Sequence, residues 1–232
     1  FDFINLPDRS VKPRTSGITM AIDKNLGLRA IQDFIETAGN FVDILKCGWG
    51  TSTVCPREVM TEKLRLLTEQ DILVCPGGTL FEVAFIQQSF DDYLKEAKQL
   101  GFNSIEISDG TISISHETKL DCIRKAKDAG FTVFSEIGKK FKIEDQHYGL
   151  DQRIEHALEE LEAGSFKVIS EARESGSFGI FDESGKIIPE YLEKMVQKVG
   201  LDNIIFEAPR TAQQQWLISN LGNSVNIGNV PP

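Results

Sequence analysis

Thr132-Val-Phe-Ser-Glu136 is the stretch of sequence that decides the fold, because a short β-rich run ends there abruptly on a carboxylate. Five other runs carry an ionisable residue at their end: Gly17–Asp23, Val42–Lys46, Ser104–Asp109, Lys167–Glu171 and Asn203–Glu207. An apolar strand that is buried on both faces has no reason to end on a charge unless its carboxyl end opens onto a site. The pattern therefore predicts parallel strands whose carboxyl ends share one functional mouth.

Short β-rich runs alternate with amphipathic stretches along nearly the whole chain. The expected strands begin near Ile18, Val42, Ile72, Ser104, Thr132, Phe166, Ile204 and Val225. Their spacing of roughly 20–40 residues fits a strand, a helix and two loops. We therefore predict an α/β fold, a single-domain (β/α)8 TIM barrel over residues 17–232, after an irregular N-terminal arm over residues 1–16. A doubly wound sheet is the competing architecture, but the first βα turn, Asp23–Leu28, lacks its Gly-rich fingerprint.

The amphipathic stretches end at glycines, as helices that lead into barrel strands commonly do. The expected helices are Leu28–Gly39, Pro56–Gln70, Phe90–Leu100, Thr118–Ala129, Leu150–Ala163 and Pro189–Val199. In the second helix, spacing places Val59, Lys63, Leu66 and Leu67 on the buried face. The sequence given stops at Val230-Pro-Pro, so it contains no helix after the last strand; the alternatives are that the barrel lacks this helix, that the N-terminal arm replaces it, or that it lies beyond the given sequence.

Composition excludes several classes of function. The net charge is −10 and the 25 Lys and Arg residues form no basic stripe, which argues against nucleic acid as a partner. The sequence contains no run of 18 or more apolar residues, so no membrane span is expected. Its first residues do not resemble a signal peptide. The four cysteines form no C-x-x-C pair and predict reduced thiols in a cytoplasmic protein.

Clustered carboxylates at the mouth predict a metal. Glu106, Glu136, Glu171 and Glu207 all stand near strand ends, and like charges in one place need a cation or raised pKa values. A hard divalent ion with oxygen ligands, most simply Mg²⁺, meets that need. The alternative is that each Glu forms an ion pair with a neighbouring Lys or Arg.

Two lysines are the candidate catalytic residues. Lys46 could bind an anion, form a Schiff base or transfer a proton, and Gly48 and Gly50 would let a ligand approach the backbone that follows it. Its alternative is an internal ion pair with Glu106 or Asp23. Lys139 follows the fifth strand and is placed as a general acid or a phosphate ligand.

The remaining candidates would bind substrate. Arg14, Arg173 and Arg210 are candidate clamps for phosphate, carboxylate or sulfonate. Gly228 and Asn229 form a turn at the eighth strand, where barrels often bind phosphate through backbone N–H groups, and Trp49 could cover the ligand. The histidines His116, His147 and His156 are expected to be solvated or on the surface, and no Ser-His-Asp arrangement is legible.

Two sequence blocks are more specific than the rest, namely Lys46-Cys-Gly-Trp-Gly-Thr51 and Pro76-Gly-Gly-Thr-Leu-Phe-Glu82. Weaker segments extend the same pattern over nearly the whole chain: Pro13–Met20, Asp23, Gly27–Leu28, Asp33–Phe34, Ala38–Gly39, Val42–Leu45, Ile105–Gly110, Glu136–Lys139, Ile169–Gly176 and Phe206–Pro209. Together these segments resemble the phosphosulfolactate synthase family.

The resemblance implies a barrel enzyme, a carbon–sulfur lyase, that requires Mg²⁺ and adds sulfite to phosphoenolpyruvate to give (2R)-O-phospho-3-sulfolactate. In methanogens this reaction begins coenzyme M biosynthesis; bacterial relatives feed sulfolactate formation, and plant relatives are heat-stress-associated proteins. It also implies a homo-oligomer, with a trimer as the expected form.

In this chemistry sulfite attacks the methylene carbon and negative charge builds on the substrate carboxylate, where a metal held by Glu106, Glu136 and Glu171 would stabilise it. Lys139 would protonate the adjacent carbon, while Lys46, Arg173 and the strand-eight turn would hold phosphate and sulfite. Two other functions stay open: a Lys-dependent aldolase or isomerase acting on a phosphorylated substrate, and a non-catalytic, stress-related relative that binds partners.

Overall fold

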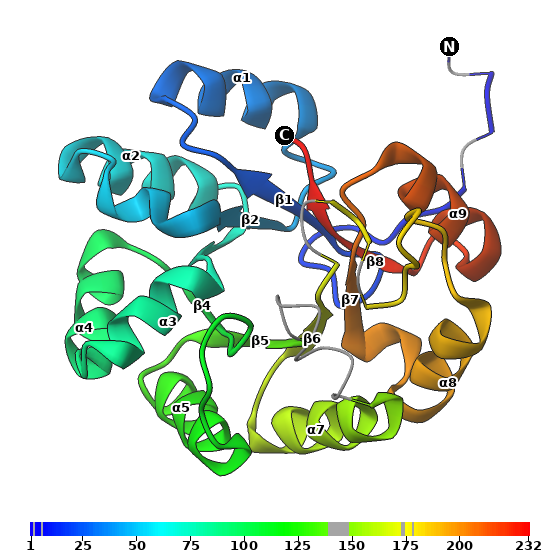
Figure 1. The fold of residues 1–232 in the computed structure, drawn as a ribbon. Helices are drawn as coiled ribbons and strands as arrows, with labels where there is room; N and C mark the ends of the chain where they lie inside the picture. Colours follow the sequence, from blue (N-terminus) through cyan, green and yellow to red (C-terminus); the bar gives the residue numbers. More distant parts are fainter. Residues whose placement is uncertain (2, 6, 139–148, 173–174, 178) are drawn as a thin grey trace.

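Eight strands surrounded by helices form a barrel in the computed structural model, which describes residues 1, 3–5, 7–138, 149–172, 175–177 and 179–232 (Figure 1). The strands are β1 (Thr19–Asp23), β2 (Ile44–Cys47), β3 (Leu73–Pro76), β4 (Ser104–Ile107), β5 (Thr132–Ile137), β6 (Lys167–Ser170), β7 (Ile204–Glu207) and β8 (Asn226–Val230). The described α-helices are α1 (Leu28–Ala38), α2 (Arg57–Thr68), α3 (Gly78–Ile86), α4 (Phe90–Leu100), α5 (His116–Asp128), α7 (Leu150–Ala163), α8 (Pro189–Val199) and α9 (Thr211–Leu221). Two 3₁₀ segments, η1 (Gly48–Thr53) and η2 (Leu201–Asn203), complete the described elements.

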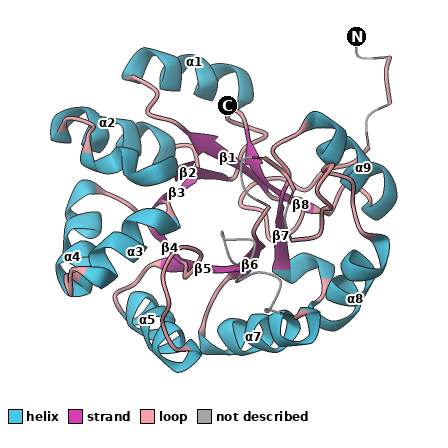
Figure 2. Cartoon of the chain, in the orientation of Figure 1, coloured by secondary structure: helices cyan, strands magenta, loops and turns pink. Residues whose placement is uncertain are grey.

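The sheet is parallel and nearly closed. Its strand order is β3-β2-β1-β8-β7-β6-β5-β4, so the two ends of the sheet are neighbours in sequence. β3 and β4 come together at this seam, where Val74 N donates to Asn103 Oδ1 over 2.8 Å. The helices lie outside the strands all around the ring (Figure 2), which confirms the predicted (β/α)8 barrel.

All eight expected strands are present, and the differences lie in the helices. α3 and α9 were not among the expected ranges, and α5 begins two residues earlier than expected, at His116. The buried face of α2 contains Met60 and Leu64 beside Lys63 and Leu67, whereas Val59 and Leu66 are only partly buried. Gly101 adopts the expected left-handed conformation at φ 104°, but Gly39 is right-handed at φ −53°.

The barrel interior is filled by apolar side chains below the mouth. Met20, Ile44, Cys75, Phe134, Ile169 and Ile205 are all fully buried and pack together with Ile18. Because inward-pointing side chains fill a barrel of this size rather than leaving a pore, the interior is closed below this level. Ligands can therefore enter only from the end of the barrel that stays open.

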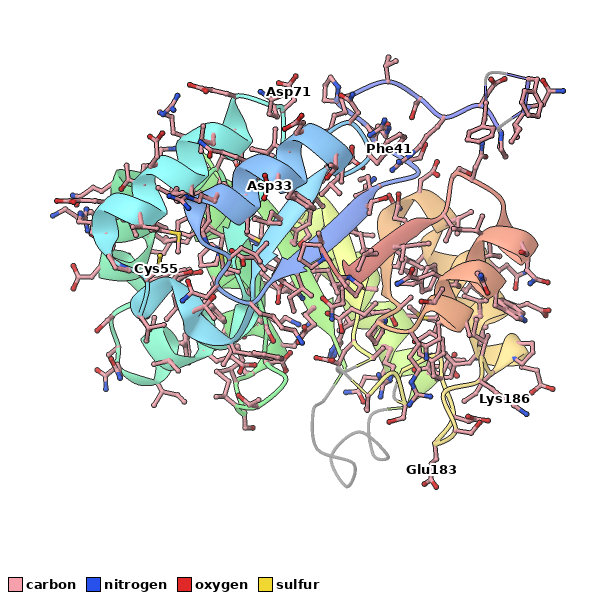
Figure 3. All side chains as sticks on the ribbon, turned by 90° about the horizontal axis from the view of Figure 1, so that it is seen from above. Asp33, Phe41, Cys55, Asp71, Glu183 and Lys186 are labelled. Atoms are coloured by element: carbon pink, nitrogen blue, oxygen red, sulfur yellow. The ribbon has the colours of Figure 1, made fainter. Side chains whose placement is uncertain are left out.

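The N-terminal segment lies at the amino ends of the strands. Lys12 Nζ donates to the carbonyl oxygens of Gly39 and Gln70, at 2.8 and 3.0 Å, in the chain before β2 and β3. Figure 3 shows the barrel from the side, with Phe41 and Asp71 at this end and Glu183 and Lys186 at the other. The arm thus covers the end opposite to the carboxyl mouth. Among the described residues, no helix combines the length and the apolar character needed to cross a bilayer.

Candidate active site at the carboxyl ends of the strands

A cavity of about 450 Å³ opens at the carboxyl ends of the strands. Its charged lining, among the described residues, is one ammonium and four carboxylates: Lys46, Glu106, Glu136, Glu171 and Glu207. Its other walls include Trp49, Thr79, Thr111 and Asn229. The side chains that the strand-end pattern singled out therefore meet in one place, although they are spread over more than 160 residues of sequence.

Lys46 is the positive centre of this cavity. It ends inside the barrel, with its Nζ atom 2.9 Å from Glu207 Oε1 and 3.2 Å from Glu106 Oε2. Burial alone would lower the pKa of Lys46, but the charges of Glu106, Glu207 and Glu136 outweigh it and raise that pKa well above its ordinary value. The charged form of Lys46 is therefore favoured, and its ammonium bridges β4 and β7 across the mouth.

Glu136, Glu171 and Glu207 form a group that could hold a metal ion. Each offers a carboxylate oxygen, these oxygens all lie within 4.8 Å of one another, and all three residues are buried. Oxygen atoms gathered at the carboxyl ends of the neighbouring strands β5, β6 and β7 fit a hard divalent cation. The predicted ligand set of Glu106, Glu136 and Glu171 shares two members with this group, which has Glu207 as its third.

Glu106 faces the neighbouring sector of the mouth. Its Oε1 atom accepts a hydrogen bond from Gly78 N over 2.9 Å, and Oε2 pairs with Lys46. A Cβ atom at Gly78 would come within 2.7 Å of Glu106 Oε1 and 2.5 Å of Ser108 Cβ, so only glycine fits there. Gly78, the first residue of α3, thus lets its main-chain N–H reach a carboxylate at the mouth.

Trp49 and Asn229 line the cavity as expected, whereas Gly228 is not part of the lining and packs against Met20. Trp49 has a left-handed backbone, is 54% exposed, and has Lys24 Nζ 4.7 Å from its ring centre. Asn229 is 8% exposed, and its buried Oδ1 atom has no hydrogen-bond partner among the described residues. A Cβ atom at Gly228 would meet Met20 Cε at 2.9 Å, so this glycine permits close packing below the mouth.

The two described arginine candidates lie outside the cavity. Arg14 Nη1 binds Asp43 Oδ1 over 2.8 Å at the amino ends of the strands, where the arginine anchors the arm. Arg210 precedes α9 and donates from Nη1 to the carbonyl oxygen of Ser184 over 2.8 Å. Each of these arginines thus binds a partner away from the cavity, Asp43 for Arg14 and the carbonyl oxygen of Ser184 for Arg210. Lys139 and Arg173, as well as His147, lie outside the described residues.

Three side chains around the mouth were not identified from the sequence, namely Glu82, Ser108 and Lys119. Glu82 and Ser108 are buried and hydrogen-bonded to each other over 3.0 Å. Lys119 Nζ binds Asp109 Oδ1 at 2.9 Å, Glu160 Oε1 at 2.7 Å and the carbonyl oxygen of Glu136 at 2.6 Å. The available signal for Glu82 was its place in the block Pro76–Glu82, since a carboxylate on an otherwise apolar segment needs a buried partner.

The described histidines are not simply solvated, which corrects the expectation. His116 begins α5, and its ring stacks on that of His156 of α7 with 3.6 Å between centres. His116 Nε2 lies 2.7 Å from Glu159 Oε2. Burial, followed by the charges of His116 and Lys119, lowers the pKa of His156 to about 4. The pair joins two outer helices and does not reach the cavity.

The thiols carry no chemistry at the mouth. All four cysteines are free, and burial raises the pKa of Cys47 to about 12, so this thiol stays protonated at neutral pH. Cys47 acts as a small apolar side chain beside Lys46.

Comparisons with known proteins identify the family of this chain. The sequence profile described as (2R)-phospho-3-sulfolactate synthase (ComA) matches residues 7–232. The phosphosulfolactate synthase of Methanothermobacter thermautotrophicus is 42% identical over 100% of this chain and 90% of its own length. That of Methanocaldococcus jannaschii is 41% identical over 92% of this chain and 86% of its own. The Arabidopsis thaliana protein HEAT-STRESS-ASSOCIATED 32 is 25% identical over 95% and 84%.

Solved structures with distant sequences share the fold. Phosphonopyruvate hydrolase in complex with oxalate and Mg²⁺ superposes with a TM-score of 0.57 at 16% identity, covering 91% of this chain and 75% of that one. The 3-hexulose-6-phosphate synthase of Salmonella typhimurium gives a TM-score of 0.58 at 17% identity, covering 91% and 88%. At such identities the likeness concerns the barrel alone. The full-length family match and the relatives above 40% identity show that this chain is an enzyme and belongs to the phosphosulfolactate synthase family.

Proposed function

We propose that this enzyme adds sulfite to phosphoenolpyruvate to give (2R)-O-phospho-3-sulfolactate, with Mg²⁺ bound by Glu136, Glu171 and Glu207. The observation that carries the proposal is the charge of the cavity, where one ammonium faces four buried carboxylates among the described residues. Such an excess of buried negative charge is costly without a further cation. A divalent ion would remove that cost and leave Lys46 and the metal to hold an anionic substrate.

The chemistry of the donors supports the metal. Three carboxylate oxygens within 4.8 Å of one another suit a small ion that prefers oxygen ligands. Phosphonopyruvate hydrolase, which shares the fold, was solved with Mg²⁺ and oxalate. When bound, the metal would stabilise the negative charge that builds on the substrate carboxylate during sulfite attack.

In the proposed reaction a C–S bond forms at the methylene carbon, and the electron pair of the double bond moves toward the substrate carboxylate. A proton then goes to the carbon that carries the phosphate ester. Lys46 stays charged, because its pKa is raised, and would attract one of the anionic groups. The amide oxygen of Asn229 has no partner in the part of the chain that the structure describes, and it could accept a hydrogen bond from a protonated substrate group.

Lys139 remains the proposed proton donor, on the basis of its place directly after Glu136-Ile-Gly138. Lys139→Ala should lower turnover by about 10²–10⁴-fold, as expected when a positioned acid is removed. Steady-state kinetics with sulfite and phosphoenolpyruvate measure this change. A near-normal rate would assign the proton to another donor while leaving the metal site intact.

A Schiff-base mechanism at Lys46 is disfavoured by the same electrostatics. A lysine attacks a carbonyl only as the neutral amine, whereas Glu106 and Glu207 keep Lys46 protonated. Reduction with borohydride in the presence of phosphorylated carbonyl substrates should therefore leave Lys46 unlabelled. Labelling would support the aldolase alternative.

The proposed activity is tested by mixing the enzyme with phosphoenolpyruvate, sulfite and Mg²⁺, with and without EDTA. We expect (2R)-O-phospho-3-sulfolactate to form in the presence of Mg²⁺, and we expect EDTA to stop its formation. No product from a correctly folded protein would instead support the non-catalytic, stress-related function; the name of the Arabidopsis thaliana relative associates that protein with heat stress.

A further inference from the structure

Lys119 is a buried lysine beside the cavity, and no part of the proposed reaction uses it. It lies on α5 in the outer layer of the barrel and is 3% exposed. Its Nζ atom donates to the carbonyl oxygen of Glu136 over 2.6 Å and to Asp109 Oδ1 over 2.9 Å. The same atom pairs with Glu160 Oε1 of α7 over 2.7 Å. One ammonium therefore joins the end of β5, the chain that follows β4 and a neighbouring helix.

The carbonyl of Glu136 receives this donor at a place where the sheet ends on one side. β5 continues to Ile137, whereas its neighbour β4 ends at Ile107. Ile137 O accepts from Glu171 N on the β6 side. Successive carbonyl groups of a strand point to opposite sides, so Glu136 O faces the side of β4. Lys119 thus supplies a donor to a main-chain oxygen beyond the last residue of β4.

The contacts of Lys119 hold both the main chain and the side chain of Glu136. The hydrogen bond to the carbonyl fixes the peptide group that follows Glu136. The bond to Asp109 fixes the chain next to Ser108, whose Oγ atom can donate its one hydrogen to Glu136 Oε1 over 2.7 Å. Glu160, which is fully buried, supplies the counter-charge that a buried ammonium needs.

We propose that Lys119 is a positioning residue, which directs the Glu136 carboxylate toward the cation by fixing the ends of β4 and β5. The inference rests on the proposed function. Lys119 does not line the cavity, so its effect would pass through Glu136. Removing outer partners of a metal ligand typically lowers metal affinity by about 10–100-fold.

Charge and position predict opposite results when Lys119 is replaced. The ammonium repels a nearby cation, so loss of its charge alone should strengthen cation binding, whereas loss of its contacts should weaken it. Lys119→Met alone would also leave Glu160 buried without a counter-charge, which costs stability. The test therefore uses the double variant Lys119→Met/Glu160→Gln, which makes both side chains neutral and keeps the net charge of the protein.

We expect the double variant to bind Mn²⁺ about 10–100-fold more weakly than the wild type, measured by calorimetry without substrate under conditions where both are folded. Glu160→Gln alone keeps the bonds from Lys119 to Glu136 and should stay close to the wild type. The matched control is Lys63→Met/Asp23→Asn, because it neutralises another buried pair, 2.7 Å apart, whose members do not line the cavity. It should leave Mn²⁺ affinity unchanged.

A second comparison decides the matter if the double variant does not fold. Asp109→Ala and Asp109→Asn remove the same negative charge from a residue that is only partly buried, but only asparagine keeps an oxygen acceptor for Lys119. Asp109→Ala should therefore weaken Mn²⁺ binding further than Asp109→Asn does. Equal affinities in these two variants would overturn the positioning role.

The outcomes distinguish this inference from the proposed function. Wild-type Mn²⁺ affinity in the folded double variant would overturn the role of Lys119 and leave the metal site standing. The same loss in Glu160→Gln, or in the control pair, would also overturn it, because the effect would then not depend on the contacts of Lys119. Absence of Mn²⁺ binding in the wild type would overturn the metal site and, with it, the positioning of Glu136.

Discussion

Two buried lysines, Lys63 and Lys46, show how differently one barrel can use the same residue. Lys63 of α2 is fully buried and pairs with Asp23 over 2.7 Å, and Asp23 is fully buried as well. Lys46 of β2 is also buried but is shared between Glu106 and Glu207 at the wall of a cavity. The first lysine faces one equal charge, whereas the second faces an excess of opposite charge.

The difference separates a structural ion pair from a functional one. Asp23 Oδ1 also accepts from Leu26 N over 2.6 Å, so the buried pair of Lys63 and Asp23, called the sealed pair below, closes the turn between β1 and α1. Its two charges balance each other. At the mouth the four carboxylates exceed the one lysine, and Asn229 keeps an unpartnered oxygen among the described residues. A site that is incomplete in charge and hydrogen bonds is one that a ligand completes.

The largest effect on stability is expected at the sealed pair. Lys63→Met leaves the Asp23 carboxylate buried without a counter-charge and should lower the free energy of unfolding by about 3–5 kcal/mol. Urea unfolding measures it. Adding Asp23→Asn should recover most of the loss, because asparagine is neutral and still accepts from Leu26 N. If the double variant is as unstable as the single one, the loss comes from packing instead.

The next effect concerns Lys46 and is catalytic. Lys46→Met should lower turnover by about 10²–10³-fold, or roughly 3–4 kcal/mol in the barrier, because an electrostatic donor facing the substrate is removed. It should cost less stability than Lys63→Met, since the carboxylates that it releases reach a cavity open to cations and water. Equal kinetic effects of both lysine substitutions would erase the distinction between the two regions.

A smaller effect is expected from the cation itself. Free Mg²⁺ at 100 times its dissociation constant should stabilise the wild type by about 2.7 kcal/mol, because it binds the folded state only. Glu171→Gln removes one of the three proposed ligands and should lose most of this gain in urea unfolding. Should the variant gain as much as the wild type, the carboxylate group would not be the binding site.

The smallest effect is the pH dependence of stability that comes from the stacked histidines His116 and His156, which take part in neither lysine site. The pKa of His156 is lowered to about 4 in the folded chain, from an ordinary value near 6.5. Between these values the unfolded chain binds a proton that the folded chain does not, so stability is lost as the pH falls through this window. Because the ring is about half buried, screening limits the loss to about 1 kcal/mol. His156→Gln should flatten the pH dependence of unfolding between pH 4 and 6.5, and an unchanged slope would contradict this origin.

The barrel could be predicted from the sequence because each strand is a short apolar run with a charge at its end, as in Thr132–Glu136. α3 could not, because Gly78–Ile86 is apolar around nearly its whole circumference and has no helical period. Arg14 shows a similar limit: its type suits an anion clamp, but the end of the barrel at which the arm lies depends on tertiary contacts with Asp43.

The sequence predicted that the carboxylates gather at the mouth, but it did not predict which of them contacts which partner. Lys46 crosses from β2 to Glu207 on β7, and that contact is set by how side chains meet across the barrel rather than by spacing along the chain. Glu106 is drawn to Gly78 N and Lys46, which leaves Glu207 within reach of Glu136 and Glu171.

The most direct test is diffraction from crystals grown with Mn²⁺ and phosphoenolpyruvate, using the anomalous signal of the metal. We expect one strong peak bonded to carboxylate oxygens of Glu136, Glu171 and Glu207, with the substrate between that peak and Lys46. A peak elsewhere, or an empty mouth beside bound substrate, would contradict it.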